Sequence, residues 1–327
     1  MAELSVIVPF YNVEAYMERC LDSIQNQTFS DFIVYCINDG TKDNSRDIAA
    51  KFAEKDERFI LLDKQNGGLS DARNFAFPYA DSEFVVFIDS DDFLELDCFE
   101  KSIEKMKKDQ LDFIVYDYYQ YFEATEKKEV IHIPLLEDQV YCLDADASIL
   151  VNINNSAWNK MFRLSLFKNH EIVYPVGIRY EDLAILPTLI AYAKRIGSLS
   201  TPLYNYIADR SGNITTAVDE KMYDIFKSCQ NFIDSYKELD IFSKYQEELK
   251  HLAFINIREN MRKCLNMKDD AFVYSFYERS FVFMNDNFDN PMQFKYDIGA
   301  GKENTIYTNE SKLKSYYRIR KLLKGGK

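Results

Sequence analysis

Short apolar runs alternate with amphipathic stretches in the first part of this chain. The runs have the length of β-strands and lie at residues 4–8, 32–38, 59–63 and 84–89. Between them, apolar residues recur at helical spacing over residues 15–26, 45–55 and 68–76. A strand, a helix and a second strand in succession form a parallel pair with a right-handed crossover. The alternation therefore predicts an α/β, Rossmann-like sheet that is mostly parallel and flanked by helices.

The pattern changes beyond residue 92. Further helices are expected at residues 96–108, 145–152 and 183–193. Two strands, at 112–122 and 130–133, are expected to form a hairpin at the sheet edge. Past about residue 217 only helical spacing remains, and a chain of 327 residues exceeds the usual size of one domain. We therefore predict an α/β domain over residues 1–216 and a helical C-terminal domain over residues 217–327.

The chain is acidic, with a formal net charge of -13. This charge argues against a nucleic-acid partner, because phosphate backbones are bound chiefly through clustered Lys and Arg. The six cysteines are scattered and form no metal-like cluster, which indicates reduced thiols. The sequence has neither a signal-peptide pattern nor an apolar run of membrane-spanning length. These features predict a cytoplasmic protein.

Polar residues follow each predicted strand of the first half. The strand ends are Pro9-Phe10-Tyr11-Asn12, Asn38-Asp39-Gly40-Thr41, Asn66-Gly67-Gly68-Leu69-Ser70 and Asp89-Ser90-Asp91-Asp92. In open α/β sheets, ligands bind beyond the carboxyl ends of the strands. None of these ends carries the glycine-rich phosphate loop of a dinucleotide-binding dehydrogenase or a P-loop NTPase, so both classes are disfavoured.

A divalent cation is another way to neutralise bound phosphate. Mg²⁺ and Mn²⁺ prefer oxygen ligands and bind through one or two carboxylates plus substrate phosphates. Asp89 and Asp91 would point the same way on an extended strand, as such an ion requires. The alternative is that these acidic residues only form a turn or a helix cap.

The order of these motifs resembles that of the family 2 glycosyltransferases with the GT-A fold. The matching elements are Ser5–Asn12, Ile37–Thr41, Asn66–Asn74 and Asp89–Asp92. The resemblance covers about residues 1–215 and is most specific through Phe93. It implies an inverting transferase of the type that builds bacterial surface polysaccharides or glycoprotein glycans, with a UDP-sugar donor and Mn²⁺ or Mg²⁺. It also implies a nucleotide-sugar-binding part at about residues 1–110 and an acceptor-binding part at about 111–216.

The resemblance implies roles for single residues as well. The residues expected to bind the nucleotide are Pro9, Tyr11, Asn12, Asp39, Gly68, Arg73, Asp89 and Ser90. Asp39 would accept a hydrogen bond from uracil, and Arg73 would lie near base and phosphate. Asp89 would meet the ribose or a metal-bound water, and Asp91 would bind the metal. Turn, cap or surface ion-pair chemistry is the alternative for Asn12, Asp39 and Arg73.

Two later elements also resemble the family. Trp158-Asn159-Lys160 is similar to an element of its polysaccharide-building members. Trp158 would stack on a sugar or lie in the core, and Lys160 would approach phosphate or be solvated. Glu181-Asp182 resembles the family's Glu-Asp element, which implies Asp182 as the general base and Glu181 as a residue that positions it or pairs with it. A plain acidic helix start is the alternative for this pair.

The sequence departs from the family pattern near the expected metal and diphosphate. Residues 204–216 resemble the family's closing loop, with Arg210 as a candidate diphosphate contact, but Ile207 stands where an arginine is common. The histidines that lie in no matching metal-binding motif are His132, His170 and His251. Metal ligands beyond Asp91 are therefore not assigned.

The C-terminal residues 312–327 are basic, with aromatic and apolar residues between the charges. They would either lie on the anionic inner face of a membrane or form a solvated or disordered terminus. The glycan acceptor would be lipid-linked or protein-linked. Two other functions stay open: a sugar-phosphate nucleotidyltransferase, whose glycine-rich basic loop is missing from Val8–Val13, and a non-catalytic nucleotide-sugar-binding subunit.

Overall fold

The computed structural model describes residues 2–210, 218–298 and 305–325. The chain divides into two compact units, Met1–Asn213 and Ile214–Lys327. The predicted domain boundary at residues 216 and 217 lies outside the described residues.

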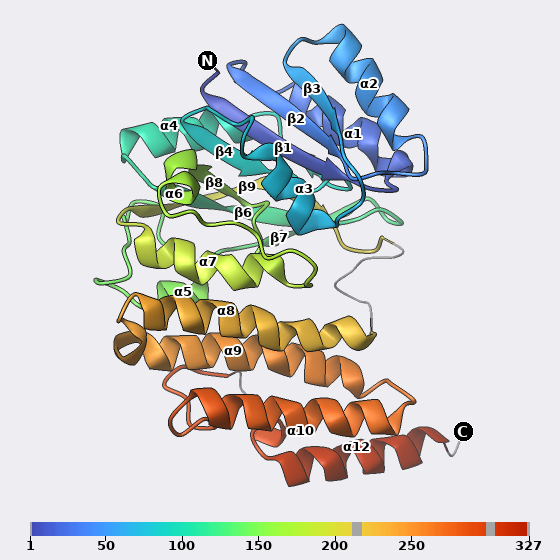
Figure 1. Cartoon of the computed structure of the whole chain (residues 1–327), viewed down its shortest axis with the longest axis vertical. Helices are drawn as coiled ribbons and strands as arrows, with labels where there is room; N and C mark the ends of the chain where they lie inside the picture. Colours follow the sequence, from blue (N-terminus) through green and yellow to red (C-terminus); the bar gives the residue numbers. More distant parts are fainter. Residues whose placement is uncertain (1, 211–217, 299–304, 326–327) are drawn as a thin grey trace. The chain divides into compact units, whose positions relative to one another are not determined.

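The described strands of the first unit form one sheet (Figure 1). They are β1 (Leu4–Phe10), β2 (Phe32–Asn38), β3 (Phe59–Asp63), β4 (Phe84–Phe87), β5 (Phe93–Leu94), β6 (Phe113–Phe122), β7 (Lys127–Ile131), β8 (Lys160–Arg163) and β9 (Ile196–Ile207). The order across the sheet is β3-β2-β1-β4-β8-β6-β9-β5, and β7 pairs with β6. The helices of this unit are α1 (Glu14–Gln25), α2 (Ser45–Lys55), α3 (Leu69–Ala76), α4 (Cys98–Lys108), α5 (Ile149–Asn152), α6 (Leu164–Lys168) and α7 (Glu181–Tyr192).

The first half of the sheet follows directly from its sequence. All seven residues of β1 are buried, because the strand lies between β2 and β4 and is covered on both faces. Helix α1 buries Met17, Cys20, Leu21 and Ile24, which recur at the spacing of one helix face. Strands β1, β2, β3 and β4 run parallel, so their carboxyl ends meet at one edge of the sheet. The predicted α/β class is confirmed.

The second half of the sheet is mixed rather than mostly parallel. Strand β8 runs antiparallel to both of its neighbours, β4 and β6. Strands β6 and β7 form the predicted hairpin, although β7 begins at Lys127 and ends at Ile131. The predicted helix at 145–152 is helical only over Ile149–Asn152.

One expectation was wrong in this region. Tyr204–Ile207 do not belong to a closing loop, because they are the last residues of β9. Tyr204 pairs with Tyr118 of β6 on one side and with Leu94 of β5 on the other, so the segment is fixed within the sheet. Residues 211–216 of the expected loop lie outside the described residues.

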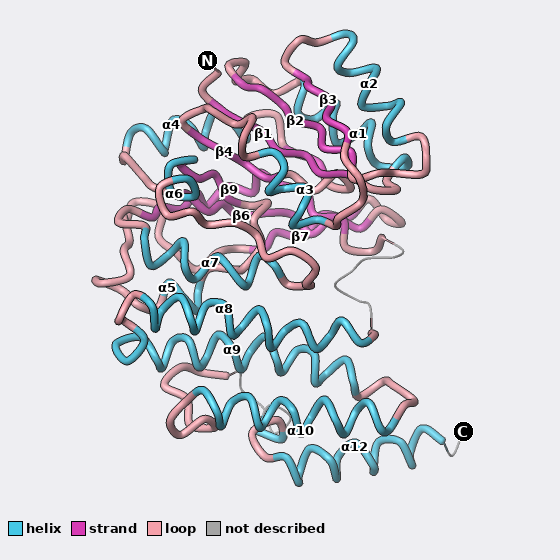
Figure 2. Tube along the Cα trace, viewed as in Figure 1, coloured by secondary structure: helices cyan, strands magenta, loops and turns pink. Residues whose placement is uncertain are grey.

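The second unit is helical. Its long helices are α8 (Asp224–Glu238), α9 (Phe242–Cys264), α10 (Asp270–Asn287) and α12 (Glu310–Gly325). Within this unit, α8 packs on α9, α9 on α10 and α10 on α12, and Figure 2 shows these helices lying side by side. Helix α8 turns an apolar face inward that includes Phe232, Ile233 and Tyr236.

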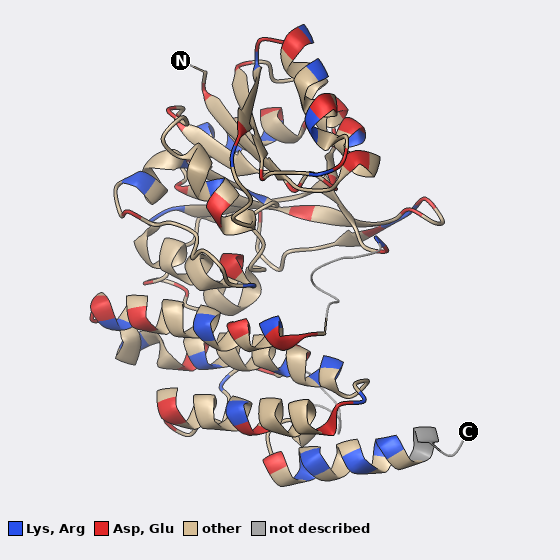
Figure 3. Ribbon diagram, turned by 45° about the vertical axis from the view of Figure 1, so that its right-hand side comes forward, with Lys and Arg blue, Asp and Glu red and all other residues tan. Residues whose placement is uncertain are grey.

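The basic C-terminal residues form helix α12 as far as Gly325 (Figure 3). Leu313 and Tyr317 are buried, and the Tyr317 hydroxyl donates to Asp270 Oδ1 at 2.7 Å. The Lys321 ammonium binds the same carboxylate at 2.6 Å. Residues 310–325 thus form a helix that packs through Leu313 and Tyr317, and membrane contact stays a prediction. Within residues 2–210, 218–298 and 305–325, no helix combines the length and apolar character that crossing a bilayer requires.

Candidate active site

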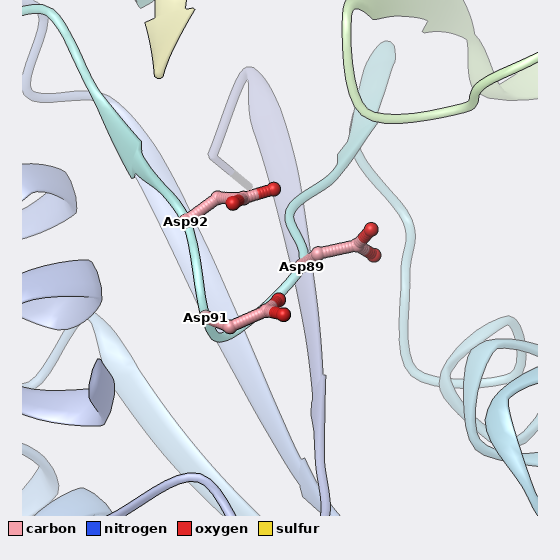
Figure 4. Close-up of side chains that lie close together, drawn as sticks. All are labelled: Asp89, Asp91 and Asp92. Atoms are coloured by element: carbon pink, nitrogen blue, oxygen red, sulfur yellow. The ribbon is translucent and has the colours of Figure 1, made fainter. Parts of the chain in front are cut away.

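The chain turns sharply where β4 ends. The Asp92 amide donates to the Asp89 carbonyl at 3.0 Å, which closes a turn over Asp89-Ser90-Asp91-Asp92. The turn replaces the extended geometry expected for Asp89 and Asp91. It still gathers the carboxylates, because oxygens of Asp89, Asp91 and Asp92 lie within 4.8 Å of one another (Figure 4).

The three carboxylates of this acidic turn differ in what they can bind. Asp92 is buried, and its two oxygens accept hydrogen bonds from the Tyr204 hydroxyl and the Ile207 amide, each at 2.8 Å. Burial raises the pKa of Asp92 well above its ordinary value. Asp89 and Asp91 are partly exposed, at 26% and 27% of their side chains. Only these two therefore offer accessible oxygens that fit a divalent cation.

Arg210 reaches the acidic turn from the end of β9. Its guanidinium pairs with Asp91 and lies 5.5 Å from the ring centroid of Tyr16. A cationic side chain thus lies against the carboxylate that is expected to bind the metal. This is the region in which a metal-bound diphosphate would also carry its negative charge.

Arg73 of α3 is the centre of a buried ion cluster. Its side chain is 0% exposed, and its guanidinium binds Asp182 Oδ1 at 2.6 Å, Asp89 Oδ1 at 3.0 Å and Glu181 Oε1 at 3.1 Å. The Tyr174 ring lies 4.9 Å from the guanidinium carbon. Arg73 was expected near base and phosphate. The structure encloses it between the acidic turn and the start of α7, and its part in binding stays a prediction.

The backbone before α7 sets the direction of the two acidic residues. Tyr180 has a φ of 67°, a left-handed conformation that is uncommon for a residue with a side chain. Helix α7 begins at the next residue, so Glu181 and Asp182 stand in its first turn. Asp182 Oδ2 also accepts a hydrogen bond from the Ala157 amide at 3.0 Å. Both oxygens of Asp182 are therefore held by donors.

The carboxylates around Arg73 outnumber the cation. Burial raises the pKa of Asp89 to about 6, with Arg73 acting in the opposite direction. Burial also raises the pKa of Glu181 to about 7, and the neighbouring charge of Asp182 adds to this rise. Protons therefore bind and leave this cluster close to neutral pH.

Replacing Glu181 by Gln is expected to stabilise the fold more at pH 8 than at pH 5. The folded pKa of about 7 lies above the ordinary value of 4.5, so the wild-type protein loses stability as pH rises between these two values. The variant has no carboxyl to ionise and should gain on the order of 1 kcal/mol at pH 8. Thermal melts of both proteins at the two pH values measure the difference. An equal gain in stability at both pH values would contradict the raised pKa of Glu181.

The ends of β1 and β2 interlock through polar side chains. Asn12 has a φ of 53°, and its Oδ1 accepts from the Lys42 amide at 3.0 Å. Asp39 is almost completely buried and accepts from Lys64 Nζ and from the Gly67 and Gly68 amides at 2.5 to 2.8 Å. Asp39 was expected to bind uracil. In the structure its carboxylate holds the turn that leads into α3.

The remaining residues expected around the nucleotide differ in exposure. Pro9 is buried inside β1, Tyr11 is exposed just beyond it, and Ser90 is buried within the acidic turn. Gly68 precedes α3 with a φ of 88°, which a glycine adopts without strain. The structure thus places these residues around one edge of the sheet, and their part in binding stays a prediction.

Trp158 and Lys160 both lie inside the protein. The Trp158 ring stacks on those of Tyr204 and Tyr206, with centroids 4.5 and 5.5 Å apart, and belongs to the hydrophobic core. Of the two interpretations of Trp158, the structure agrees with the core residue. Lys160 is 0% exposed, so in this structure it is neither solvated nor free to meet a phosphate.

Two contributors to the site were not predicted. Tyr204 joins the acidic turn to β9, because its hydroxyl donates to Asp92 and accepts from the Asp89 amide at 3.3 Å. Lys64 pairs with both Asp39 and Asp71, each at 2.5 Å. Lys64 directly follows β3, so its position at a strand end could have identified it as a candidate site residue. Tyr204 was expected only as the first residue of the loop at 204–216, because its strand was missed.

Comparisons with known proteins bear on the family and the fold. The family described as "Glycosyl transferase family 2" matches residues 5–170. GlyA, a glycosyltransferase of Streptococcus pneumoniae, is 32% identical over 67% of this chain, and the match spans 32% of GlyA. EpsH of Bacillus subtilis is 31% identical over 73% of each chain. The crystal structure of Staphylococcus aureus TarS 1–349 in complex with UDP-GlcNAc superposes with a TM-score of 0.71 at 18% identity, covering 99% of this chain and 92% of that one. The fold is thus that of the GT-A glycosyltransferases.

Proposed function

This chain belongs to glycosyltransferase family 2, and from that membership we propose that it transfers a sugar from a UDP-sugar to a hydroxyl of a glycan acceptor, with inversion. The observation that carries the proposal is the cluster around Arg73. It joins Asp89 of the acidic turn to Asp182 at the start of α7, so the residue proposed for the donor site and the residue proposed as the base share one ion-pair network. The UDP-GlcNAc and UDP complexes of a structural neighbour, TarS, support UDP as the nucleotide.

The donor would bind at the carboxyl ends of the parallel strands. We assign Asp91 as the metal ligand and Asp89 as the contact to ribose or to a metal-bound water, since both offer exposed oxygens. Mn²⁺ or Mg²⁺ bound there would offset the negative charge that develops on the departing diphosphate. Arg210 would exchange its bond to Asp91 for one to the diphosphate. The nucleoside would lie against Pro9, Tyr11 and Asn12, the residues at the end of β1.

Asp182 would act as the general base. Direct displacement with inversion requires a group that removes the acceptor proton as the hydroxyl attacks the sugar carbon. Arg73 and the Ala157 amide hold the two oxygens of Asp182 in place. Glu181 would share Arg73 and carry a proton near neutral pH.

The metal site is tested by replacing Asp91 with Asn. In the wild-type protein, UDP at 100 times its Kd should stabilise the fold by about 2.7 kcal/mol and raise the Tm by about 4 °C when Mn²⁺ is present. The D91N variant should lose most of this shift, because one ligand charge is gone. Asp47→Asn, the same change on exposed α2, is the control and should keep it. A full Mn²⁺-dependent shift in D91N would contradict the assignment.

The acceptor is proposed from the family alone. We propose a lipid-linked or protein-linked glycan, built in the cytoplasm, and a contact of helix α12 with an anionic membrane face. The exposed basic residues Lys312, Arg318 and Lys321 support that contact. Flotation with anionic liposomes, comparing the full chain with a variant in which these three residues are Gln, tests it. Equal flotation would contradict it.

A further inference from the structure

Lys160 is a fully buried lysine that the proposed reaction does not use. It is the first residue of β8, where it pairs with Val115 of β6, and its side chain is 0% exposed. A lysine buried this deeply is rare, because removing an ammonium from water is costly unless every proton finds an acceptor.

The acceptors of Lys160 all come from the segment just before it. The ammonium donates to the Ser156 carbonyl at 2.6 Å, the Asn154 carbonyl at 2.8 Å and Asn159 Oδ1 at 2.9 Å. Asn154 Oδ1 is a further acceptor at 3.1 Å. Lys160 thus closes the segment of residues 154–159, here called the lysine loop, on itself.

All the acceptors that bind the Lys160 ammonium in these hydrogen bonds are uncharged oxygens. Burial lowers the pKa of Lys160 to about 7, and the negative charge of Asp182 acts in the opposite direction. If the side chain at position 160 served only to fill this space, an apolar residue of the same volume would avoid the desolvation cost of the ammonium. The ammonium therefore acts on its surroundings through its hydrogen bonds to the loop.

The lysine loop holds the carboxylate that we assign as the base. The amide of Ala157, in the middle of the loop, donates to Asp182 Oδ2 at 3.0 Å. The carbonyl of Trp158, the next residue, accepts from the Tyr116 hydroxyl at 3.0 Å, which anchors the loop to β6. Without the Lys160 bonds, the Asn154 and Ser156 carbonyls lose their partners and the Ala157 amide loses its support.

We propose that Lys160 is a positioning residue, which acts through the lysine loop and the Ala157 amide to hold Asp182 in the orientation for proton removal. This inference rests on the proposed role of Asp182. Lys160 itself touches neither substrate nor metal in this scheme.

Replacing Lys160 by Met is expected to lower kcat by about 10- to 100-fold, since a small misplacement of a reacting group has effects of this size. The KM for the donor and the affinity for UDP with Mn²⁺ should change by less than about 2-fold. The control is Lys105→Met. Lys105 is also largely buried and donates to a carbonyl, that of Glu137 at 2.7 Å, but lies on α4. The Lys105→Met variant should be less stable than the wild-type protein but have the same kcat.

The decisive measurement is a double-mutant cycle with Asp182→Asn, followed with a radiolabelled donor. If Lys160 acts through Asp182, K160M should cause no further loss in the D182N background. An equal loss in both backgrounds, or unchanged kcat in K160M, would overturn the inference. Retained turnover in D182N alone would instead overturn the assignment of the base. If K160M does not fold, Asn154→Ala keeps the ammonium but removes one acceptor, and should lower kcat about 3- to 10-fold by the same route.

Discussion

Asp182→Asn is expected to lower kcat for sugar transfer by about 1,000-fold or more, while UDP and Mn²⁺ bind as in the wild-type protein. The amide keeps the size of the side chain and its contact with Arg73, but it cannot take the acceptor proton. Asp182 is not among the partly exposed carboxylates of the acidic turn, so the metal site should persist. Steady-state assays with saturating donor, together with titration of UDP in the presence of Mn²⁺, measure the two properties separately.

Glu181→Gln is the matched control for this prediction. It makes the same chemical change one residue earlier, on a carboxylate that binds the same Arg73 nitrogen. Its effect on kcat should be at least 10-fold smaller than that of Asp182→Asn. Glu181 has a pKa of about 7 and is largely protonated below neutral pH, so it cannot take the acceptor proton there. Equal losses would show that the pair acts only by supporting Arg73. Wild-type turnover in D182N would place the base elsewhere.

Arg73→Met is expected to cause the largest loss of stability of any single change in the site. It leaves the carboxylates of Asp89, Glu181 and Asp182 close together without their shared cation. Removal of one partner from a buried ion cluster typically costs about 3–5 kcal/mol. The loss should be smaller at pH 5.5 than at pH 8, because Asp89 and Glu181 already titrate at about 6 and about 7 with Arg73 present.

Denaturant unfolding at the two pH values tests this prediction. Arg46→Met is the control, because Arg46 binds Asp63 through two hydrogen bonds, yet both side chains are 48% exposed. A surface pair of this kind contributes at most about 1 kcal/mol. Two results would contradict a buried ion cluster around Arg73. One is a loss of unfolding free energy in R73M no greater than that in R46M, and the other is a loss that does not depend on pH.

The first half of the fold could be predicted because its signals are local. Strands β1 and β2 are buried on both faces, so each appears in the sequence as a mostly apolar run, with Ser5 as the polar residue inside β1 and Asn38 at the end of β2. Helices α1 and α2 show their buried faces through helical spacing alone. The predicted helix at 45–55 and the strands at 32–38 and 59–63 have the bounds that the structure has.

The strands that complete the sheet could not be predicted in the same way. Strand β8 has only four residues, begins with a buried lysine and ends with an arginine, so it shows no strand pattern. It exists because Met161 pairs with Val86 and Ile114, which lie far away in the sequence. Strand β5 has two residues and depends on β9 in the same manner.

The site was predicted as a set of residues rather than as a geometry. The strand-end motifs and the Glu181-Asp182 pair pointed to the residues that the structure gathers. The hydrogen bond between Arg73 and Asp182 joins positions 109 residues apart, and no local pattern encodes it. The burial of Lys160 could not be predicted either, because a charged side chain is expected at the surface unless its hydrogen-bond acceptors are known.

The central claim is that the chain breaks the bond between a sugar and a nucleoside diphosphate. Phosphorus NMR on reactions with a panel of nucleotide sugars, Mn²⁺ and sugar acceptors tests it most directly. We predict that one UDP-sugar is converted to UDP by the wild-type protein and that D182N, at the same enzyme concentration and over the same time, forms less UDP by about 1,000-fold or more. Release of pyrophosphate would identify a nucleotidyltransferase, and binding of UDP without conversion of any donor would identify a binding subunit. Either result would contradict the account.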